Sequence, residues 1–162
     1  FNRRYALPHL KRVAQESARN GSPFAVMVLD LDRFKKINDT FGHAAGDTVL
    51  REIARRLKSN IRSADLIARI GGEEFLVILP DTDLATARVA AERLRKVTCS
   101  TPIDIGDGRA PIHVTASIGV SVGGNDGAGS TQVERMVDRA DQALLGAKST
   151  GRNQVIIERT AA

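Results

Sequence analysis

Residues 66–79 read LIARIGGEEFLVIL, two short apolar runs on either side of the pair Gly71-Gly72. Each run has the length and composition of a β-strand. Glycine adopts positive φ angles at little steric cost, so the pair predicts a hairpin turn between two antiparallel strands. A hairpin at the centre of the chain favours a sheet that is at least partly antiparallel.

The run Phe24 to Leu29 is apolar at every position, which predicts a strand with both faces buried in the middle of the sheet. Around it, segments of helical and extended periodicity alternate along the chain. Helices are expected at about 3–20, 33–39, 45–59, 84–97 and 131–150, and further strands at 113–122 and 154–157. This order predicts an α+β sandwich in which helices flank a mainly antiparallel central sheet.

The composition is that of one ordinary globular domain. The 162 residues are 42% hydrophobic and 27% charged, with a formal net charge of +5. A basic surface attracts nucleic acid, anionic lipid or phosphorylated small molecules. One Tyr and no Trp give no support to a basic and aromatic surface that binds a nucleic acid polymer. Phosphate-rich small ligands remain the class to consider.

The single cysteine, Cys99, excludes an internal disulfide framework and favours a reducing compartment. No apolar run approaches the ~20 residues that span a bilayer. We therefore expect a cytoplasmic domain without a membrane segment. The chain opens at Phe1 without an initiator Met, so we expect residues 1–162 to be a single domain at the C-terminal end of a longer, regulated protein.

Two pairs of acids stand at the ends of predicted strands. Asp30 and Asp32 follow the first strand, and Glu73 and Glu74 lie at the hairpin tip. If the hairpin lies beside the first strand, these carboxylates converge. Mg²⁺ is commonly held by one or two carboxylates together with substrate phosphates, and two such ions can stabilise a phosphoryl displacement. The alternative is that acids gather at strand ends only because strand ends meet water.

The segment after the first strand carries candidate ligands for a nucleotide. The start of a helix near Phe34 and Lys35 presents free N–H groups to a phosphate. Asn38 and Asp47 lie on either side of a short stretch that contains two glycines. A carboxylate only accepts hydrogen bonds, so it complements the N1–H and N2–H₂ donors of guanine. Taken alone, Asn38 and Asp47 are more typical of turn and cap residues.

Several longer motifs occur in order along the chain. They are DLDRFKKINDTFGHAAGD at 30–47, RIGGEEF at 69–75, VTASIGVS at 114–121, ADQALLGAK at 140–148 and STGRN at 149–153. Together they resemble the GGDEF family of diguanylate cyclases, in which GGEEF is an accepted signature variant. The resemblance runs from about Asn2 to about Ile157 and is strongest to the output domain of PleD-like response regulators.

The resemblance implies a fold similar to the palm of nucleotide polymerases and class III nucleotidyl cyclases. It implies a homodimer that condenses two GTP into cyclic di-GMP and two pyrophosphates, because each 3′-hydroxyl attacks the α-phosphate of the other nucleotide. By the same resemblance, Asp30, the backbone carbonyl of Leu31 and Glu73 are ligands of Mg²⁺, or of Mn²⁺ in its place. Glu73 and Glu74 are the catalytic acids, and which of them assists deprotonation of the 3′-hydroxyl stays open.

The family pattern also assigns the contacts to GTP. Asn38 and Asp47 match the pair that reads guanine. Phe34 and Lys35 match the turn whose backbone N–H groups meet the phosphates.

A second set of matches is mostly basic. Lys148 and Arg152 match residues that reach the β- and γ-phosphates, although cations in these places also suit a helix C-terminus. Arg62 and Asp65 match the family's product-binding inhibitory site, and Arg93 a secondary contact to that product. An Arg guanidinium can bond guanine O6 and N7 bidentately. The ordinary alternatives are a surface salt bridge for Arg62 with Asp65 and a solvated helical residue for Arg93.

The chain also departs from the family pattern. Ile70 and Leu145 replace two common tyrosines, and the family's opening Asp and LTGL do not precede Asn2. None of the matched metal, phosphate or guanine positions is lost, which favours an active enzyme. Two alternatives remain: a module that binds GTP or cyclic di-GMP without turnover, and a polymerase-like or mononucleotide cyclase that makes a different product.

Overall fold

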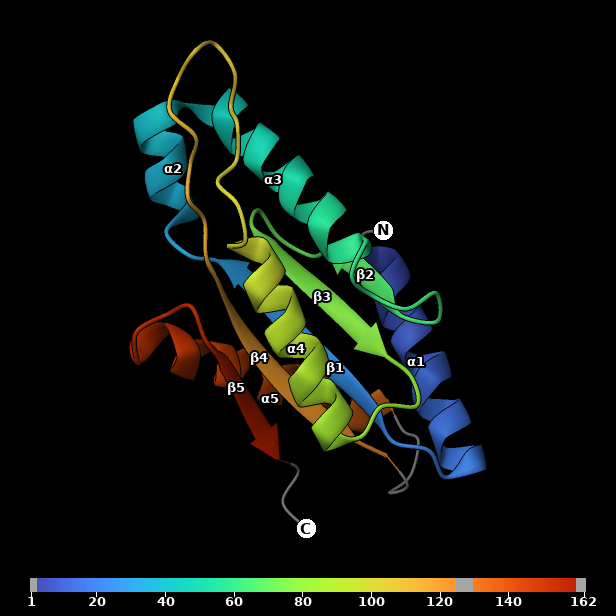
Figure 1. The fold of residues 1–162 in the computed structure, drawn as a ribbon. Helices are drawn as coiled ribbons and strands as arrows, with labels where there is room; N and C mark the ends of the chain where they lie inside the picture. The colour runs from blue at the N-terminus through green and yellow to red at the C-terminus, as the bar shows by residue number, and fades with distance from the viewer. Residues whose placement is uncertain (1–2, 125–129, 160–162) are drawn as a thin grey trace.

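One mixed sheet forms the centre of the molecule. In the residues that the computed structural model describes, 3–124 and 130–159, five strands lie in the order β2-β3-β1-β4-β5 (Figure 1). They are β1 Phe24–Leu31, β2 Leu66–Arg69, β3 Glu74–Leu79, β4 Ala116–Gly123 and β5 Val155–Arg159. Every neighbouring pair is antiparallel except β4 with β5. The prediction of a mainly antiparallel sheet with the Phe24 run at its centre is confirmed.

Helices cover both faces of this sheet (Figure 1). Apolar residues of α2 Phe34–Phe41, α3 His43–Lys58 and α4 Leu84–Thr98 pack on one face, and those of α1 Arg3–Asn20 and α5 Ser130–Ser149 pack on the other. Side chains of β1 alternate between the two cores, as strand geometry requires, and all are buried. The predicted α+β sandwich is therefore confirmed.

The loop between β2 and β3 differs from the predicted turn. Neither Gly71 nor Gly72 has a positive φ, and the last paired residues are Arg69 and Phe75, so the prediction of a tight two-glycine turn is wrong. The Arg69 guanidinium instead donates to the carbonyls of Gly71 at 3.2 Å and Gly72 at 2.7 Å. The Arg69 side chain thus holds a loop that is longer than the predicted two-residue turn. The periodicity of the sequence does not reveal this contact.

The boundaries of β4 and of the helices α2 and α3 also differ from the predicted ones. β4 begins at Ala116 rather than 113, because Ile112 pairs with Ile103 in an isolated bridge before the strand starts. α2 and α3 extend toward each other until Gly42, with a φ of 93°, is the one residue between them. Asn38 and Asp47 consequently lie inside helices, so their interpretation as turn and cap residues is wrong.

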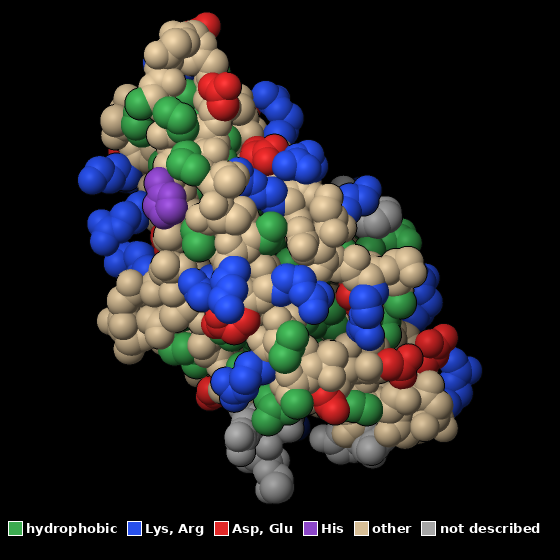
Figure 2. Space-filling view, in the orientation of Figure 1, with side chains coloured by type: hydrophobic (Ala, Val, Ile, Leu, Met, Phe, Trp, Pro, Cys, Tyr) green, Lys and Arg blue, Asp and Glu red, His purple; other side chains and the backbone are tan. Residues whose placement is uncertain are grey.

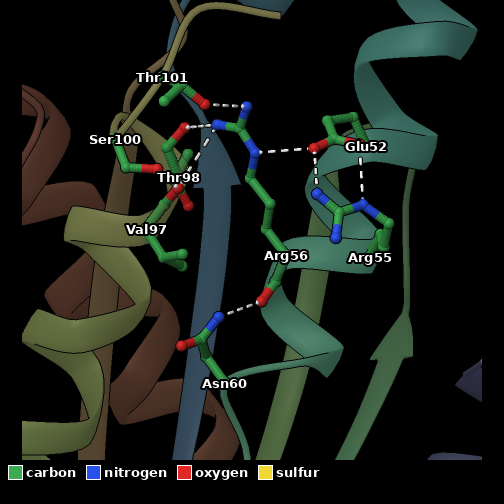
Figure 3. A network of polar contacts seen from close by, with 8 residues as sticks. All are labelled: Glu52, Arg55, Arg56, Asn60, Val97, Thr98, Ser100 and Thr101. Carbon is green, nitrogen blue, oxygen red and sulfur yellow. Dashed lines mark hydrogen bonds and ion pairs between the residues drawn. The ribbon is translucent and has the colours of Figure 1, made fainter.

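Arg56 joins α3 to the C-terminal end of α4 (Figure 3). Its buried guanidinium donates to the Thr98 carbonyl at 2.9 Å, to Thr101 Oγ1 at 2.9 Å and to the Glu52 carboxylate at 3.1 Å. Hydrogen bonds from Arg55, and then from Arg56, lower the pKa of Glu52 to about 2. A cation suits the free carbonyls at a helix C-terminus, so this network helps to hold α3 and α4 together on one face.

The surface is polar and of mixed charge. Figure 2 shows basic side chains distributed over the face that carries α4, with acidic side chains between them. On this face the basic side chains are therefore interspersed with acidic ones. Within 3–124 and 130–159, no helix combines the length and apolar character needed to cross a membrane.

Because Gly119 has no side chain, α5 can lie directly on β4. We therefore expect a substitution at Gly119 to lower the stability of the fold. A Cβ at Gly119 would stand 2.0 Å from the Ala140 carbonyl oxygen and 2.4 Å from the Leu144 nitrogen, both backbone atoms. Gly119→Ala is therefore expected to destabilise the fold by about 3 kcal/mol through overpacking. Urea unfolding followed by circular dichroism measures this change.

Gly72→Ala is the matched control for this substitution. A Cβ at Gly72 would meet no atom within 4 Å, and the residue has no positive φ, so its free energy of unfolding should change by less than about 0.5 kcal/mol. Equal stability of Gly119→Ala and the unaltered protein would contradict the close packing of α5 on β4.

Candidate active site

Asp30 occupies the centre of an acidic site at the end of β1. It is 5% exposed and lies opposite Glu74 of β3 in the strand register. Residues paired directly across antiparallel strands project from the same face of the sheet. That face is covered by α5, and Lys148 Nζ of α5 lies 2.7 Å from Asp30 Oδ2. The register therefore brings two acids and a base together from three elements.

The environment raises the pKa of both acids. Burial raises the pKa of Asp30, partly offset by the hydrogen bond and charge of Lys148, and the Asp32 charge raises it further. Burial also raises the pKa of Glu74, followed by the negative charges of Asp30 and Asp141. In both cases burial, which disfavours the ionised form, is the largest cause of the shift. An additional cation at this place would therefore be favourable.

Glu73 lies beside the end of β1 through its backbone. The Leu31 N–H donates to the Glu73 carbonyl at 3.3 Å. The prediction that the hairpin lies beside the first strand is therefore confirmed. The half-buried Glu73 follows the exposed Gly72, where a Cβ would meet only open space, so the loop leaves its outer side free for a bulky ligand.

The donors at this edge suit magnesium. Asp30 and Glu73 offer carboxylates and Leu31 offers a backbone carbonyl, all hard oxygen ligands of the type that Mg²⁺ prefers. Among the described residues, no three acidic, histidine or cysteine side chains lie close enough to form a complete metal site. Mg²⁺ usually keeps phosphate and water ligands, so this donor set fits an ion that arrives with a nucleotide.

Asp32 is set apart from the other three acids by its hydrogen bonds. Its Oδ2 accepts from Thr115 Oγ1 at 2.7 Å and from the Asn153 N–H at 3.0 Å, and its Oδ1 accepts from Ser117 Oγ at 2.7 Å. The side chain is buried and both oxygens are engaged. Asp32 therefore joins the end of β1 to β4 and to the segment before β5.

The turn before α2 presents backbone N–H groups. Arg33 has a φ of 58°, and no side chain of the described chain caps the helix N-terminus. The buried Phe34 anchors this turn, while Lys35 is exposed. The first N–H groups of a helix have no intrahelical acceptor, so those at Phe34 and Lys35 can meet an anion.

Asn38 of α2 packs against Gly46 of α3, the residue before Asp47. Asn38 Oδ1 lies so close to Gly46 that a Cβ on the glycine would stand 1.8 Å from it. The carboxamide therefore rests on the backbone of α3, one residue from the exposed Asp47. The two residues thus belong to the contact between α2 and α3, Asn38 through its side chain on Gly46 and Asp47 as the residue that follows Gly46.

A hollow of about 480 Å³ opens next to Asp47 between α3 and the strands β2 and β3. It has apolar and basic walls, formed by Asp47, Leu50, Arg51, Ala54, Lys58, Ile67, Arg69 and Phe75. Sequence reasoning missed this hollow and the contacts of Gly46 and Arg69. Both residues stand inside the quoted motifs, but their contacts depend on how α2 packs on α3 and on how the loop after Arg69 folds back to its side chain.

Lys148 and Arg152 are carried by the C-terminal end of α5. Lys148 lies in its last turn and reaches Asp30. Arg152 follows in a turn with a φ of 63°, and its N–H donates to the Ala147 carbonyl at 2.9 Å. The next residue, Asn153, is bonded to Asp32, so the turn is attached to the same end of the sheet as Asp30.

A separate cluster contains Arg62, Asp65 and Arg93, which line one small cavity of about 110 Å³. Arg62 donates to Asp65 at 2.8 Å and to the Pro80 carbonyl at 2.8 Å, and the hydrogen bond to Asp65 raises the pKa of Arg62. The Asp65 side chain is 2% exposed and that of Arg62 47%. The pair therefore differs from an ordinary surface salt bridge, because its carboxylate is buried while its guanidinium is still open to solvent.

Comparisons with known proteins identify the family. The sequence profile described as "Diguanylate cyclase, GGDEF domain" matches residues 1–154. The response regulator PleD of Caulobacter vibrioides is 48% identical over 155 residues, which make up 96% of this chain and 34% of PleD. The chain thus spans about a third of this curated relative.

Solved structures agree with the sequence match. The active GGEEF domain of a diguanylate cyclase from Vibrio cholerae is 33% identical with a TM-score of 0.87, covering 99% of this chain and 98% of that chain. The coiled coil and GGDEF domain of DgcB from Caulobacter crescentus, in complex with c-di-GMP, is 28% identical with a TM-score of 0.89, covering 97% and 81%. The chain therefore belongs to the GGDEF family of diguanylate cyclase domains.

Proposed function

We propose that this domain is a diguanylate cyclase that condenses two GTP into cyclic di-GMP and two pyrophosphates. The observation that carries the proposal is the register of β1 with β3, which sets Asp30 opposite Glu74 and Leu31 beside Glu73. The family supplies the reaction, and the retained acids, bases and guanine-reading residues support its operation here. The domain would act as the output part of a longer regulated protein.

Asp30, the Leu31 carbonyl and Glu73 would hold Mg²⁺, with Mn²⁺ as an alternative ion. The ion would supply positive charge to the phosphate oxygens during the displacement. Burial disfavours the ionised forms of Asp30 and Glu74, so a cation bound here would stabilise their charged forms. A carboxylate of Glu73 or Glu74 would accept the proton of the attacking 3′-hydroxyl.

The remaining residues would position the nucleotide. Asn38 and Asp47 would bond the guanine edge, and the N–H groups at Phe34 and Lys35 would meet the phosphates. Lys148 and Arg152 would reach the β- and γ-phosphates from α5. Phosphoryl transfer depends mainly on such positioning and on charge neutralisation, so a site with few reactive side chains is sufficient.

Two protomers are needed for the reaction. Each 3′-hydroxyl would form a new bond to the α-phosphorus of the other GTP while the bond to pyrophosphate breaks. The nucleotide held by one copy thus supplies the nucleophile for the nucleotide of the other. We therefore propose a catalytic homodimer, whose formation sets the rate.

The cluster of Arg62, Asp65 and Arg93 would bind cyclic di-GMP as a feedback inhibitor. Asp65, Pro80 and Thr82 hold Nε and Nη2 of Arg62, and the side chain remains partly exposed, so its Nη1 group would donate to an acceptor of guanine. Arg93 lines the same cavity and would contact the product from α4.

The activity itself is tested by incubation with GTP and Mg²⁺, followed by product mass determination. We expect cyclic di-GMP and pyrophosphate, loss of product on metal chelation, and at least a 100-fold lower rate for Glu73→Ala, the scale of a lost acid–base group. Glu16→Ala, an exposed acid on α1, is the control and should keep the rate. Nucleotide binding without turnover would indicate a binding module, and a product of another mass would indicate another cyclase or a polymerase.

Guanine reading depends on the space that Gly46 leaves for Asn38. Gly46→Ala displaces the carboxamide, because a Cβ would stand 1.8 Å from Asn38 Oδ1. We expect about tenfold weaker GTP binding in calorimetric titration, equivalent to one good hydrogen bond. Because Gly46→Ala acts by displacing Asn38, the double variant that combines Gly46→Ala with Asn38→Ala should bind GTP no more weakly than Asn38→Ala alone. Unchanged GTP affinity in Gly46→Ala would argue against this arrangement.

Feedback inhibition is expected to depend on Arg62. Arg62→Ala removes the guanidinium contact to guanine, so the concentration of cyclic di-GMP for half-inhibition should rise about tenfold or more. Arg19→Ala, an exposed arginine on α1, is the matched control. Identical inhibition of Arg62→Ala and the control would refute the assignment of this cavity.

A further inference from the structure

Three consecutive residues after α5 have a left-handed backbone. The φ angles are 126° at Gly151, 63° at Arg152 and 46° at Asn153. Glycine adopts such angles freely, whereas an arginine in this region is uncommon and persists when the surroundings hold it. The turn therefore needs contacts that select this conformation.

Two side chains from distant elements hold Asn153. Its N–H donates to Asp32 Oδ2 at 3.0 Å, and Asp32 is itself held by Thr115 and Ser117. From the other side, Arg95 Nη1 of α4 donates to Asn153 Oδ1 at 2.9 Å. Arg95 is oriented in turn by its ion pair with Glu92 at 2.9 Å.

The same turn is bonded to the end of α5. The Ala147 carbonyl accepts from the Arg152 N–H and from Gln154 Nε2, each at 2.9 Å. The following residue is Lys148, whose Nζ contacts Asp30. One set of hydrogen bonds thus connects the turn, the last residues of α5 and the acidic end of β1.

We propose that Asn153 is a positioning residue for the triphosphate. Held between Asp32 and Arg95, it keeps its neighbour Arg152 in the left-handed conformation, at the end of the sheet where Asp30 and Lys148 lie. Asparagine suits the position because it tolerates this backbone region and its carboxamide oxygen accepts the bond from Arg95. The inference rests on the proposed function, because it assigns Asn153 a part in binding the GTP phosphates.

The test compares two nucleotides that differ only beyond the α-phosphate. GTP carries the β- and γ-phosphates and GMP lacks both. The whole 162-residue chain and its Asn153→Gly variant are titrated with each nucleotide in Mg²⁺, by calorimetry for GTP and by NMR for GMP. Glycine permits the left-handed backbone, so this variant removes only the contact with Arg95.

Asn153→Gly should bind GTP about tenfold more weakly and GMP within about twofold of the unaltered chain. Asn153→Asp keeps an acceptor for Arg95 and should recover GTP affinity to within about threefold. In an Arg152→Ala background, Asn153→Gly should add no further loss, because Asn153 acts through Arg152. If Asn153→Gly fails to fold, Arg95→Met, which has no donor, removes the same contact from α4 and should give the same loss for GTP alone.

Three results would overturn the proposal: equal losses for GTP and GMP, losses that add in the double variant, or unaltered GTP binding by Asn153→Gly. None of these results contradicts the proposed cyclase activity, provided that the unaltered chain binds GTP. An unaltered chain that binds neither nucleotide overturns the proposed function, and the role of Asn153 with it.

Discussion

The antiparallel pairing of β1 with β3 is the constraint on which the candidate site depends. It sets Asp30 opposite Glu74 and brings the Glu73 backbone to Leu31. A slip of one residue in this register would turn Asp30 to the other face of the sheet, away from Lys148. Apart from Asp30 in β1 and Glu74 in β3, every residue of the two strands is apolar and buried, so burial of these apolar side chains specifies the register. Packing of the hydrophobic core thus determines where Asp30 and Glu74 lie.

The balance of charge around Asp30 and Glu74 is the second feature that defines the site. A buried carboxylate is costly without a partner, and Asp30 has Lys148 at 2.7 Å while Glu74 lies close to two further acids. Several acids thus surround one lysine at the end of β1, and acids whose pKa is shifted by burial and by neighbouring charges are candidates for a functional site. The close packing of α5 on Gly119 keeps Lys148 at this place. Fold and electrostatics therefore depend on the same helix.

The sequence predicted the fold well because the deciding signals are local. Unbroken apolar runs marked β1 and β3, and helical periodicity marked α3 to α5. The two-glycine turn was wrong, since the Arg69 side chain holds a longer loop. The roles of Asp32 and Arg95 could not be predicted, because their bonds to Asn153 span 121 and 58 residues of sequence. The roles of the individual site residues come from the family resemblance and stay predictions.

The most direct measurement is the position of a metal in crystals grown with Mn²⁺ and a non-hydrolysable GTP analogue, located by anomalous diffraction. We predict a manganese peak within coordination distance of Asp30, the Leu31 carbonyl and Glu73, with the triphosphate beside it. A nucleotide bound elsewhere on the domain, with no metal at the end of β1 and Asp30 still paired only with Lys148, would contradict it.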